Sequence, residues 1–335
     1  MNYGKLSEDI YERSVVKVIK NNSIENKKLY NGAEIGNFCA ISPYEDNDFV
    51  STQASAGGKH AIKRAYEATL NAIAARGEPM QISGHAYAQI TLFVPERLRE
   101  IKVREMLAET AQRAEELRIP IVGVSVEVLP WIHMATASCV VYAGCHDYGK
   151  ERRAVPGEDI VMTKWIGLEG TALIAKTDTK ELKARYPSDI VDEAADFLQY
   201  LSVMSEAATA VKSGASDLQT VREGGIFGGL WELAAKNSVG LVVDLECIPV
   251  RQETIEVCEY FDLNPYELMA GGSLLITCQN GGALVKALAD CGISSAVIGK
   301  ITQGNDRIIR HAEESRFLEP VRGDEIYQYY EKKGQ

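Results

Sequence analysis

The chain has 335 residues, of which 46% are hydrophobic and 25% are charged, a composition typical of a soluble globular protein with room for two domains. Its formal net charge of −11 argues against general binding to a nucleic-acid backbone. No apolar run is long enough to span a membrane, and the first residues carry acids where a signal peptide needs an apolar core. We therefore expect a cytoplasmic protein without nucleic-acid or membrane partners.

The seven cysteines are scattered through the chain without a CxxC pair, which indicates reduced thiols. The Cys145–His146–Asp147 segment offers possible metal ligands, but no second cluster stands at zinc-site spacing, and we interpret the segment as a turn. No metal ligand or catalytic residue is assigned.

The first part of the chain alternates between helical and extended patterns. Helical spacing covers residues 7–20, 60–76 and 100–118, with Gly77 and Pro79 ending the second helix. Strand patterns lie within 31–42 and at 49–52, 81–94, 119–130 and 134–143. Such an α+β unit has strands that need a partner surface or closure.

The second part of the chain predicts a layered α/β arrangement, beginning near residue 155 just before a Pro-Gly turn. The predicted domains are therefore residues 1–155 and 156–335. Strands are predicted at 159–163, 240–245, 273–278, 295–298 and 307–309, and helices at 167–175, 188–200, 203–212, 253–261 and 282–291.

A glycine-rich stretch, REGGIFGGLWELA, covers residues 222–234 and runs into an amphipathic segment. Its paired glycines, Gly224–Gly225 and Gly228–Gly229, permit a close approach to a helix start, where unpaired amides suit an anion such as phosphate. The alternative is a helix packed tightly on a sheet through its glycines, with no ligand. Spacing alone favours the alternative.

Several segments resemble the aminoimidazole ribonucleotide synthase (PurM-like) superfamily, and within it the HypE-like hydrogenase-maturation proteins. They are PGEDIVMTKWIGLEGTALIA, REGGIFGGLWELA, VGLVVDLECIPVRQET, GGSLLITC and AVIGKIT. The resemblance implies a two-domain fold in which N-terminal strands form a barrel shared by a homodimer. It also implies a layered C-terminal α/β domain, ATP with Mg²⁺ in the interdomain cleft, and the glycine-rich stretch beside that cleft.

The resemblance fails at the acids that would hold Mg²⁺. Relatives carry aspartates at four positions that are Phe38, Gln53, Ala72 and Thr220 in this chain. Magnesium requires hard oxygen ligands, so these four changes argue against ordinary metal-dependent ATP chemistry. The positions that the resemblance still assigns to the cofactor are Asn71, Glu127, Gly224 and Gly225.

Two interpretations follow from this departure. The first is a non-catalytic or repurposed homologue whose cleft takes a small anion without metal; ordinary surface charges or satisfied histidines are the alternative for each basic candidate. The second is an active ATP-dependent enzyme that uses displaced acids. The basic candidates are Lys59, His60, Arg76, His85 and His133, and the displaced acids are Asp46, Asp48, Glu127 and Asp217.

The end of the sequence bears on the specific maturation reaction. HypE-type enzymes carry the carbamoyl group on a cysteine in a C-terminal tail, whereas the last cysteine here is Cys291. We therefore do not expect that reaction. A subunit or regulator that binds a maturation-protein partner remains compatible with the sequence.

Overall fold

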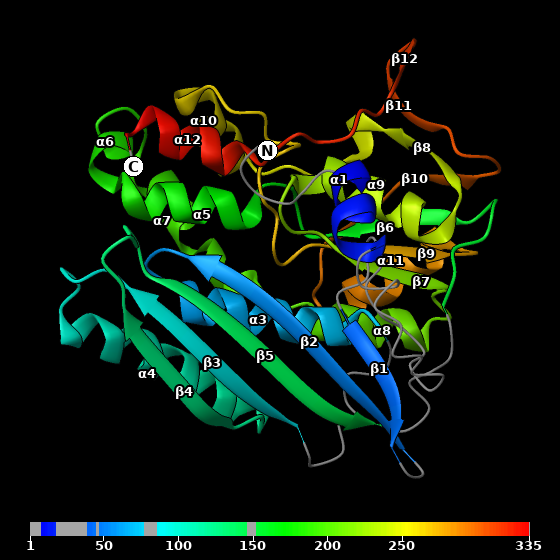
Figure 1. Ribbon diagram of the computed structural model, residues 1–335. Coiled ribbons are helices and arrows are strands. Elements are labelled where there is room, and N and C mark those ends of the chain that lie inside the picture. Colours follow the sequence, from blue (N-terminus) through cyan, green and yellow to red (C-terminus); the bar gives the residue numbers. More distant parts are fainter. Residues whose placement is uncertain (1–7, 18–38, 45–46, 77–85, 146–151, 335) are drawn as a thin grey trace. The chain divides into compact units, whose positions relative to one another are not determined.

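The computed structural model describes residues 8–17, 39–44, 47–76, 86–145 and 152–334 (Figure 1). The chain divides into two compact units. One, called unit 2 here, comprises Asn37–Lys150 with Ile24–Gly32; the other, unit 1, comprises Glu151–Gln335 with Met1–Ser23 and Ala33–Gly36. Each unit contains one sheet with helices, so the predicted mixed α+β fold is confirmed. The domain boundary near residue 155 stays a prediction.

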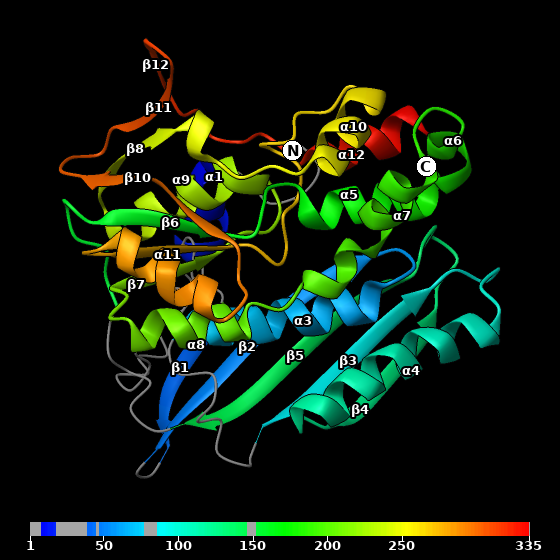
Figure 2. The same ribbon diagram turned by 180° about the vertical axis from the view of Figure 1, so that it is seen from behind.

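Unit 2 is built on a five-stranded sheet with the order β1-β2-β5-β3-β4. All neighbours are antiparallel except β3 and β4, which run parallel. Helices α3 (Ala61–Ala74) and α4 (Glu100–Leu117) lie on the same face of this sheet (Figures 1 and 2). The strands are β1 (Cys39–Tyr44), β2 (Asn47–Gly57), β3 (Tyr87–Val94), β4 (Ile121–Val128) and β5 (Thr136–Cys145).

Alternation along β3 explains why the helices cover only one face. Ala88, Ile90 and Leu92 are buried beneath them, whereas the residues between these positions are partly or fully exposed. On the other face, the Tyr142 ring packs against Phe49 and Tyr87, with ring centroids 5.8 and 5.3 Å apart. This second face is aromatic and only partly shielded by the described residues of its own unit.

Unit 1 is built on a seven-stranded sheet with the order β12-β11-β8-β10-β6-β9-β7. Helix α9 (Gly225–Asn237) lies on one face, and α8 (Met204–Lys212) and α11 (Gly281–Asp290) lie on the other (Figures 1 and 2). The strands are β6 (Asp159–Thr163), β7 (Asp217–Thr220), β8 (Gly240–Asp244), β9 (Leu274–Cys278), β10 (Ser295–Thr302), β11 (Arg307–His311) and β12 (Glu314–Phe317).

A group of helices in unit 1 forms a second apolar cluster beside the sheet. Its core includes Leu182, Val191, Phe261, Ile326 and Tyr329, all of which are buried. The helices are α5 (Leu168–Thr177), α6 (Thr179–Lys183), α7 (Ser188–Asp196), α10 (Gln252–Phe261) and α12 (Glu325–Lys332).

At the start of the chain, α1 (Glu8–Tyr11) continues into a π-helical turn, Glu12–Val16, within the predicted helix. No described helix has both the length and the apolarity that crossing a membrane requires.

Candidate functional site

The glycine-rich stretch forms the start of α9, and its first amides donate hydrogen bonds within the protein. The Gly224 amide donates to Asp324 Oδ2 at 2.6 Å, and the Gly225 amide donates to the Arg222 carbonyl at 3.2 Å. The Phe227 amide donates to a carbonyl oxygen of the segment before β9. An anion bound at Gly224 would therefore have to displace the Asp324 carboxylate.

The same glycines also allow close packing. A side chain at Gly225 would place its Cβ 2.4 Å from the Tyr266 carbonyl oxygen and 2.8 Å from that of Leu268. Gly224 and Gly225 have φ angles of +81° and +60°, in the left-handed region that favours glycine. Close packing of α9 therefore requires Gly225, whether or not a ligand binds nearby, and the backbone conformation favours glycine at both positions. The cofactor roles of Gly224 and Gly225 stay predictions.

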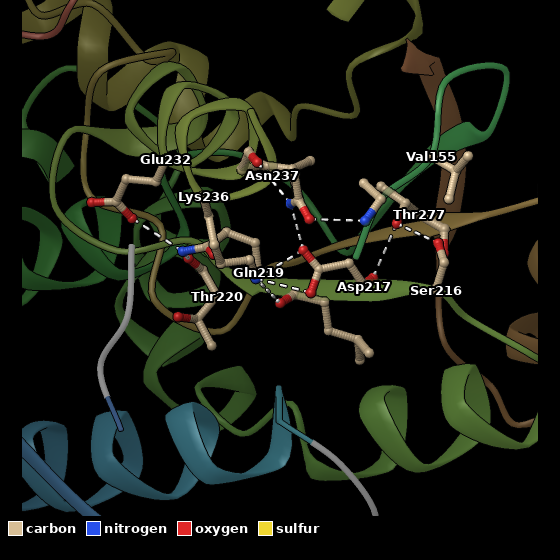
Figure 3. Close-up of polar contacts among 12 residues, drawn as sticks. Val155, Ser216, Asp217, Gln219, Thr220, Glu232, Lys236, Asn237 and Thr277 are labelled. Carbon is tan, nitrogen blue, oxygen red and sulfur yellow. Dashed lines mark hydrogen bonds and ion pairs between the residues drawn. The ribbon is translucent and has the colours of Figure 1, made fainter. Parts of the chain in front are cut away.

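Asp217 is the displaced acid of unit 1, and its carboxylate is held inside a polar network (Figure 3). The residue is 2% exposed, and its carboxylate accepts hydrogen bonds from Lys236 Nζ at 2.9 Å and from Asn237 Nδ2 at 2.7 Å. Asn237 Oδ1 in turn accepts a hydrogen bond from the Ala154 amide at 2.8 Å. The Lys236 ammonium therefore balances the Asp217 charge, and Asp217 joins α9 to β7.

Thr220 stands where relatives carry an aspartate, at the end of β7. It is 4% exposed and pairs with Leu274 of the neighbouring strand. The adjacent Gln219 is buried too, and its Nε2 donates to Glu232 Oε2 at 3.1 Å (Figure 3). Within unit 1, the carboxylates of Asp217 and Glu232 are thus directed at protein partners.

In unit 2, Gln53 and Glu127 lie on the same face of the sheet but far apart. Strand register aligns Gln53 with Gly123 across the sheet, and Glu127 lies four residues further along the edge strand. At about 4.8 Å between strands and 3.3 Å per residue, Gln53 and Glu127 are separated by more than roughly 15 Å. Gln53 Nε2 donates to Ser138 Oγ at 3.2 Å.

Asn71 and Ala72 lie in α3, which packs on the opposite face of that sheet. Thr69 of α3 contacts Cys139, whose side chain is buried on the helix-covered face. Asn71 and Ala72 are 5% and 7% exposed. Unit 2 therefore does not bring the predicted cofactor positions Asn71 and Glu127 together, and their roles stay predictions.

The basic residues singled out from the sequence lie in different parts of unit 2 or outside the described residues. Lys59, His60 and His133 line a common pocket at one end of the unit 2 sheet. Arg76 follows the last turn of α3 and does not line this pocket. Several candidates lie outside the described residues: Phe38, Asp46, His85, His146 and Asp147, together with the side chains of Asp48 and Cys145.

No group of three or more His, Cys, Asp or Glu residues with the geometry of a metal site occurs within the ranges that the structure describes. Among the positions expected to hold Mg²⁺, Gln53, Ala72 and Thr220 offer an amide, a methyl group and a hydroxyl. This donor set does not fit a magnesium ion, which prefers carboxylates and water in octahedral geometry.

Residues 155–311 match the family described as AIR synthase related protein, C-terminal domain. Carbamoyl dehydratase HypE of Rhodobacter capsulatus is 24% identical over 283 residues, 82% of this chain and 78% of its own length. Carbamoyl dehydratase HypE of Rhizobium leguminosarum bv. viciae is 26% identical over 164 residues, 47% of this chain and 44% of its own length. This chain also covers only about half the length of two further HypE proteins, those of Cupriavidus necator and Azotobacter vinelandii.

Solved structures share the fold over nearly the whole chain. The crystal structure of a HypE–HypF complex matches with a TM-score of 0.68 at 14% identity, covering 92% of this chain and 99% of that one. A ThiL structure complexed with AMPPCP and TMP matches with a TM-score of 0.66 at 16% identity, covering 94% and 99%. The match at residues 155–311 places an AIR synthase-related C-terminal domain in the second half of the chain. Over most of its length the chain resembles the HypE proteins in sequence, and it shares the fold of the HypE and ThiL structures.

Proposed function

We propose that this chain is a HypE-like homologue that keeps the scaffold of the ATP-binding PurM-like superfamily without Mg²⁺–ATP chemistry. The main observation behind the proposal is that the Asp217 carboxylate already accepts hydrogen bonds from Lys236 and Asn237. Asp217 lies three residues before Thr220, and it could serve a metal only by leaving the partly buried ammonium of Lys236 without its partner. Gln53 and Ala72 supply no replacement charge.

The test is a calorimetric titration of the protein with Mg²⁺–ATP, with a carbamoyl dehydratase HypE titrated in parallel as the positive control. We expect no saturable heat from this protein up to about 1 mM nucleotide. Micromolar binding together with ADP release would contradict the proposal. That result would favour the alternative, an active enzyme that uses displaced acids such as Glu127 or Asp48.

We also propose that the aromatic face of the unit 2 sheet pairs with a second copy of the chain. The support is the contrast between its two faces along β2, β5 and β3. The helices bury the residues of these strands on one face, whereas Gln53 and Gln89 are exposed on the other, beside the Tyr142 aromatic cluster. Association with a second copy would stabilise such a sheet, because it would bury the side that its own helices leave open.

Light scattering after size exclusion tests this pairing. The wild-type protein should elute as a dimer, and Val140→Glu, which places a charge on the open face, should shift it towards monomer. Glu105→Gln on the exposed side of α4 is a control that should leave the dimer intact. A wild-type monomer at all concentrations would exclude the homodimer. One of the similar solved structures is a HypE–HypF complex. We further propose that this chain binds an equivalent maturation protein, and co-elution of the two proteins in the same assay tests this.

A further inference from the structure

The pocket that contains Lys59 and His60 is formed by four segments of unit 2. They are the turn between β2 and α3, the loop between β3 and α4, the first turns of α4, and the residues just before β5. The cavity has a volume of about 470 Å³, which lies within the range of small-molecule sites. Gly58, with a φ angle of +94°, ties the first segment to the last, because its amide donates a hydrogen bond to the Ala135 carbonyl oxygen at 2.8 Å.

The positive charges of this pocket are only partly balanced. Lys59 is exposed and makes no side-chain hydrogen bond or ion pair with any residue that the structure describes. Arg97 donates one hydrogen bond, from Nη2 to the His133 carbonyl at 3.2 Å, which orients the guanidinium at the rim. Its other N–H groups remain available for a planar oxyanion.

Both carboxylates of the pocket are already paired. Glu105 accepts a hydrogen bond from Lys102 at 2.6 Å, and Glu109 accepts one from Lys63 at 3.1 Å and bonds His60 at 3.0 Å. The His60 hydrogen bond is the main cause that lowers the pKa of Glu109 to about 2. The remaining imbalance in the pocket is therefore positive, which favours an anion over a metal cation.

His60 adds a polar atom without a partner. Because Glu109 is ionised at neutral pH, its bond to His60 Nδ1 is donated by the imidazole. The other ring nitrogen, Nε2, is buried and has no hydrogen-bond partner among the described residues. Buried nitrogen atoms in folded proteins nearly always have partners, so an unpaired one on a pocket-lining residue points to a ligand.

Apolar side chains supply the rest of the lining. Leu98, Met106 and Met134 are among them. Methionines adapt their shape to different ligands, and such surfaces bury the apolar body of a small molecule.

We propose that this pocket binds a small organic oxyanion, with its apolar body packed on Leu98, Met106 and Met134. Its phosphoryl or carboxylate group is held by Lys59, by Arg97 and by His60, whose ring is protonated in the complex so that Nε2–H donates to the anion while Nδ1–H donates to Glu109. All of these residues lie within unit 2. The inference is therefore independent of the missing Mg²⁺–ATP chemistry proposed above.

The experiment titrates the full chain with phenyl phosphate, benzoate, inorganic phosphate and phenol. Nuclear magnetic resonance of the protein with ¹⁵N-labelled histidine reads out the site. We expect phenyl phosphate or benzoate to bind about tenfold more tightly than inorganic phosphate, because the ring buries apolar surface. The His60 signals should shift, whereas those of His311, in β11 of the other unit, should not. The relative affinities of phenyl phosphate and benzoate decide between a phosphoryl and a carboxylate ligand.

Three variants test the assigned contacts. Lys59→Ala and Arg97→Ala should each weaken binding about tenfold, as the loss of one charge-assisted contact does. Arg99→Ala is the matched control, since Arg99 has the same charge two residues away and does not line the pocket. His60→Asn keeps a donor towards Glu109 but removes Nε2, and it should weaken binding without unfolding the unit.

Two results would overturn the inference. One is the absence of binding by either aromatic anion up to about 10 mM. The other is binding that responds equally to Arg97→Ala and Arg99→Ala, which would indicate general attraction to surface charge. A Mg²⁺–ATP titration of the same samples separates the outcomes, because Arg97→Ala should not change its result.

Discussion

The Asp324 carboxylate accepts a hydrogen bond from the Gly224 amide at 2.6 Å, although 100 residues of chain separate the two. The same carboxylate accepts hydrogen bonds from the Met269 amide at 3.1 Å and from the Ile326 amide at 2.9 Å. One side chain thus satisfies the start of α9, the start of α12 and the segment before β9. Asp324 therefore occupies the place that an anion would take at the glycine-rich helix start.

Replacement of Asp324 by alanine should destabilise unit 1. The change leaves three amide groups without their acceptor in a site that is 4% exposed, and we expect a loss of about 2–4 kcal/mol. Hydrogen-exchange mass spectrometry should show faster exchange at the starts of both α9 and α12.

Asp290→Ala is the control for this change, because Asp290 is exposed at the end of α11 and makes no described side-chain contact. It should change stability by less than about 0.5 kcal/mol. Faster exchange in α12 alone would mean that Asp324 acts only as a local helix cap.

The pH dependence of stability provides a second test of Asp324. Desolvation by burial is the main cause that raises its pKa from 3.8 to about 7, although the three amide donors act in the opposite direction. Between these two values the folded protein binds the proton more strongly than the unfolded chain does. The contribution of Asp324 to stability is therefore fully present below about pH 4 and is lost as the pH rises through about 7.

Thermal unfolding of the wild type and of Asp324→Asn, measured from pH 5 to pH 8, checks this sign. The asparagine does not titrate, so the stability advantage of the wild type should shrink as the pH rises. An advantage that grows with pH would show that the amide donors outweigh desolvation and that the ionised carboxylate is the favoured form.

Periodicity predicted much of the fold. The predicted helix at 60–76 and strand at 159–163 correspond to Ala61–Ala74 and Asp159–Thr163, because their apolar residues follow the spacing of the element that buries them. Helix α12 was not predicted. Its sequence EIYQYYEK is rich in tyrosine, which favours strands, and the helix depends on burial of Ile326 and Tyr329.

Strand β7 was also missed, because DLQT contains only one large apolar residue. Helix α9 supplies partners for two of its buried polar side chains, with Lys236 bonding Asp217 and Glu232 bonding Gln219. For the candidate sites, the sequence identified the glycine helix start and the basic residues Lys59, His60 and His133. It could not identify Asp324 or Arg97, because their partners are distant in the chain and no local pattern records such contacts.

The pairing of Asp217 with Lys236 predicts a strongly non-additive response to mutation. Asp217→Asn removes the carboxylate partner of an ammonium whose side chain is 14% exposed, and we expect a loss of about 2–4 kcal/mol. In the double variant with Lys236→Met, no unbalanced charge remains, and much of the loss should be recovered.

A double-mutant cycle by urea unfolding, followed by tryptophan fluorescence, measures the coupling between Asp217 and Lys236. Two of the three tryptophans, Trp165 and Trp231, lie in unit 1, so the signal is weighted towards the unit that changes. Additive effects of the two substitutions would show that the ion pair contributes little, and that Asp217 could be released to serve a ligand.

Gly225 and Gly214 separate the two interpretations of the glycine-rich stretch. Both have positive φ angles, +60° and +81°, so alanine at either position meets the same kind of backbone strain, about 1–2 kcal/mol. A Cβ at Gly214 meets no atom within 4 Å, whereas one at Gly225 lies 2.4 Å from the Tyr266 carbonyl oxygen. Gly225→Ala should therefore cost at least about 2 kcal/mol more than Gly214→Ala, because backbone atoms of the segment before β9 must move.

The same urea unfolding assay compares the two variants, and circular dichroism confirms that each one folds. A larger loss for Gly225→Ala than for Gly214→Ala would mean that close packing of α9 requires this glycine without any ligand. Equal losses would mean that the segment around Tyr266 can move away from α9. In that case the start of α9 could open, and Asp324 could give way to an anion at Gly224.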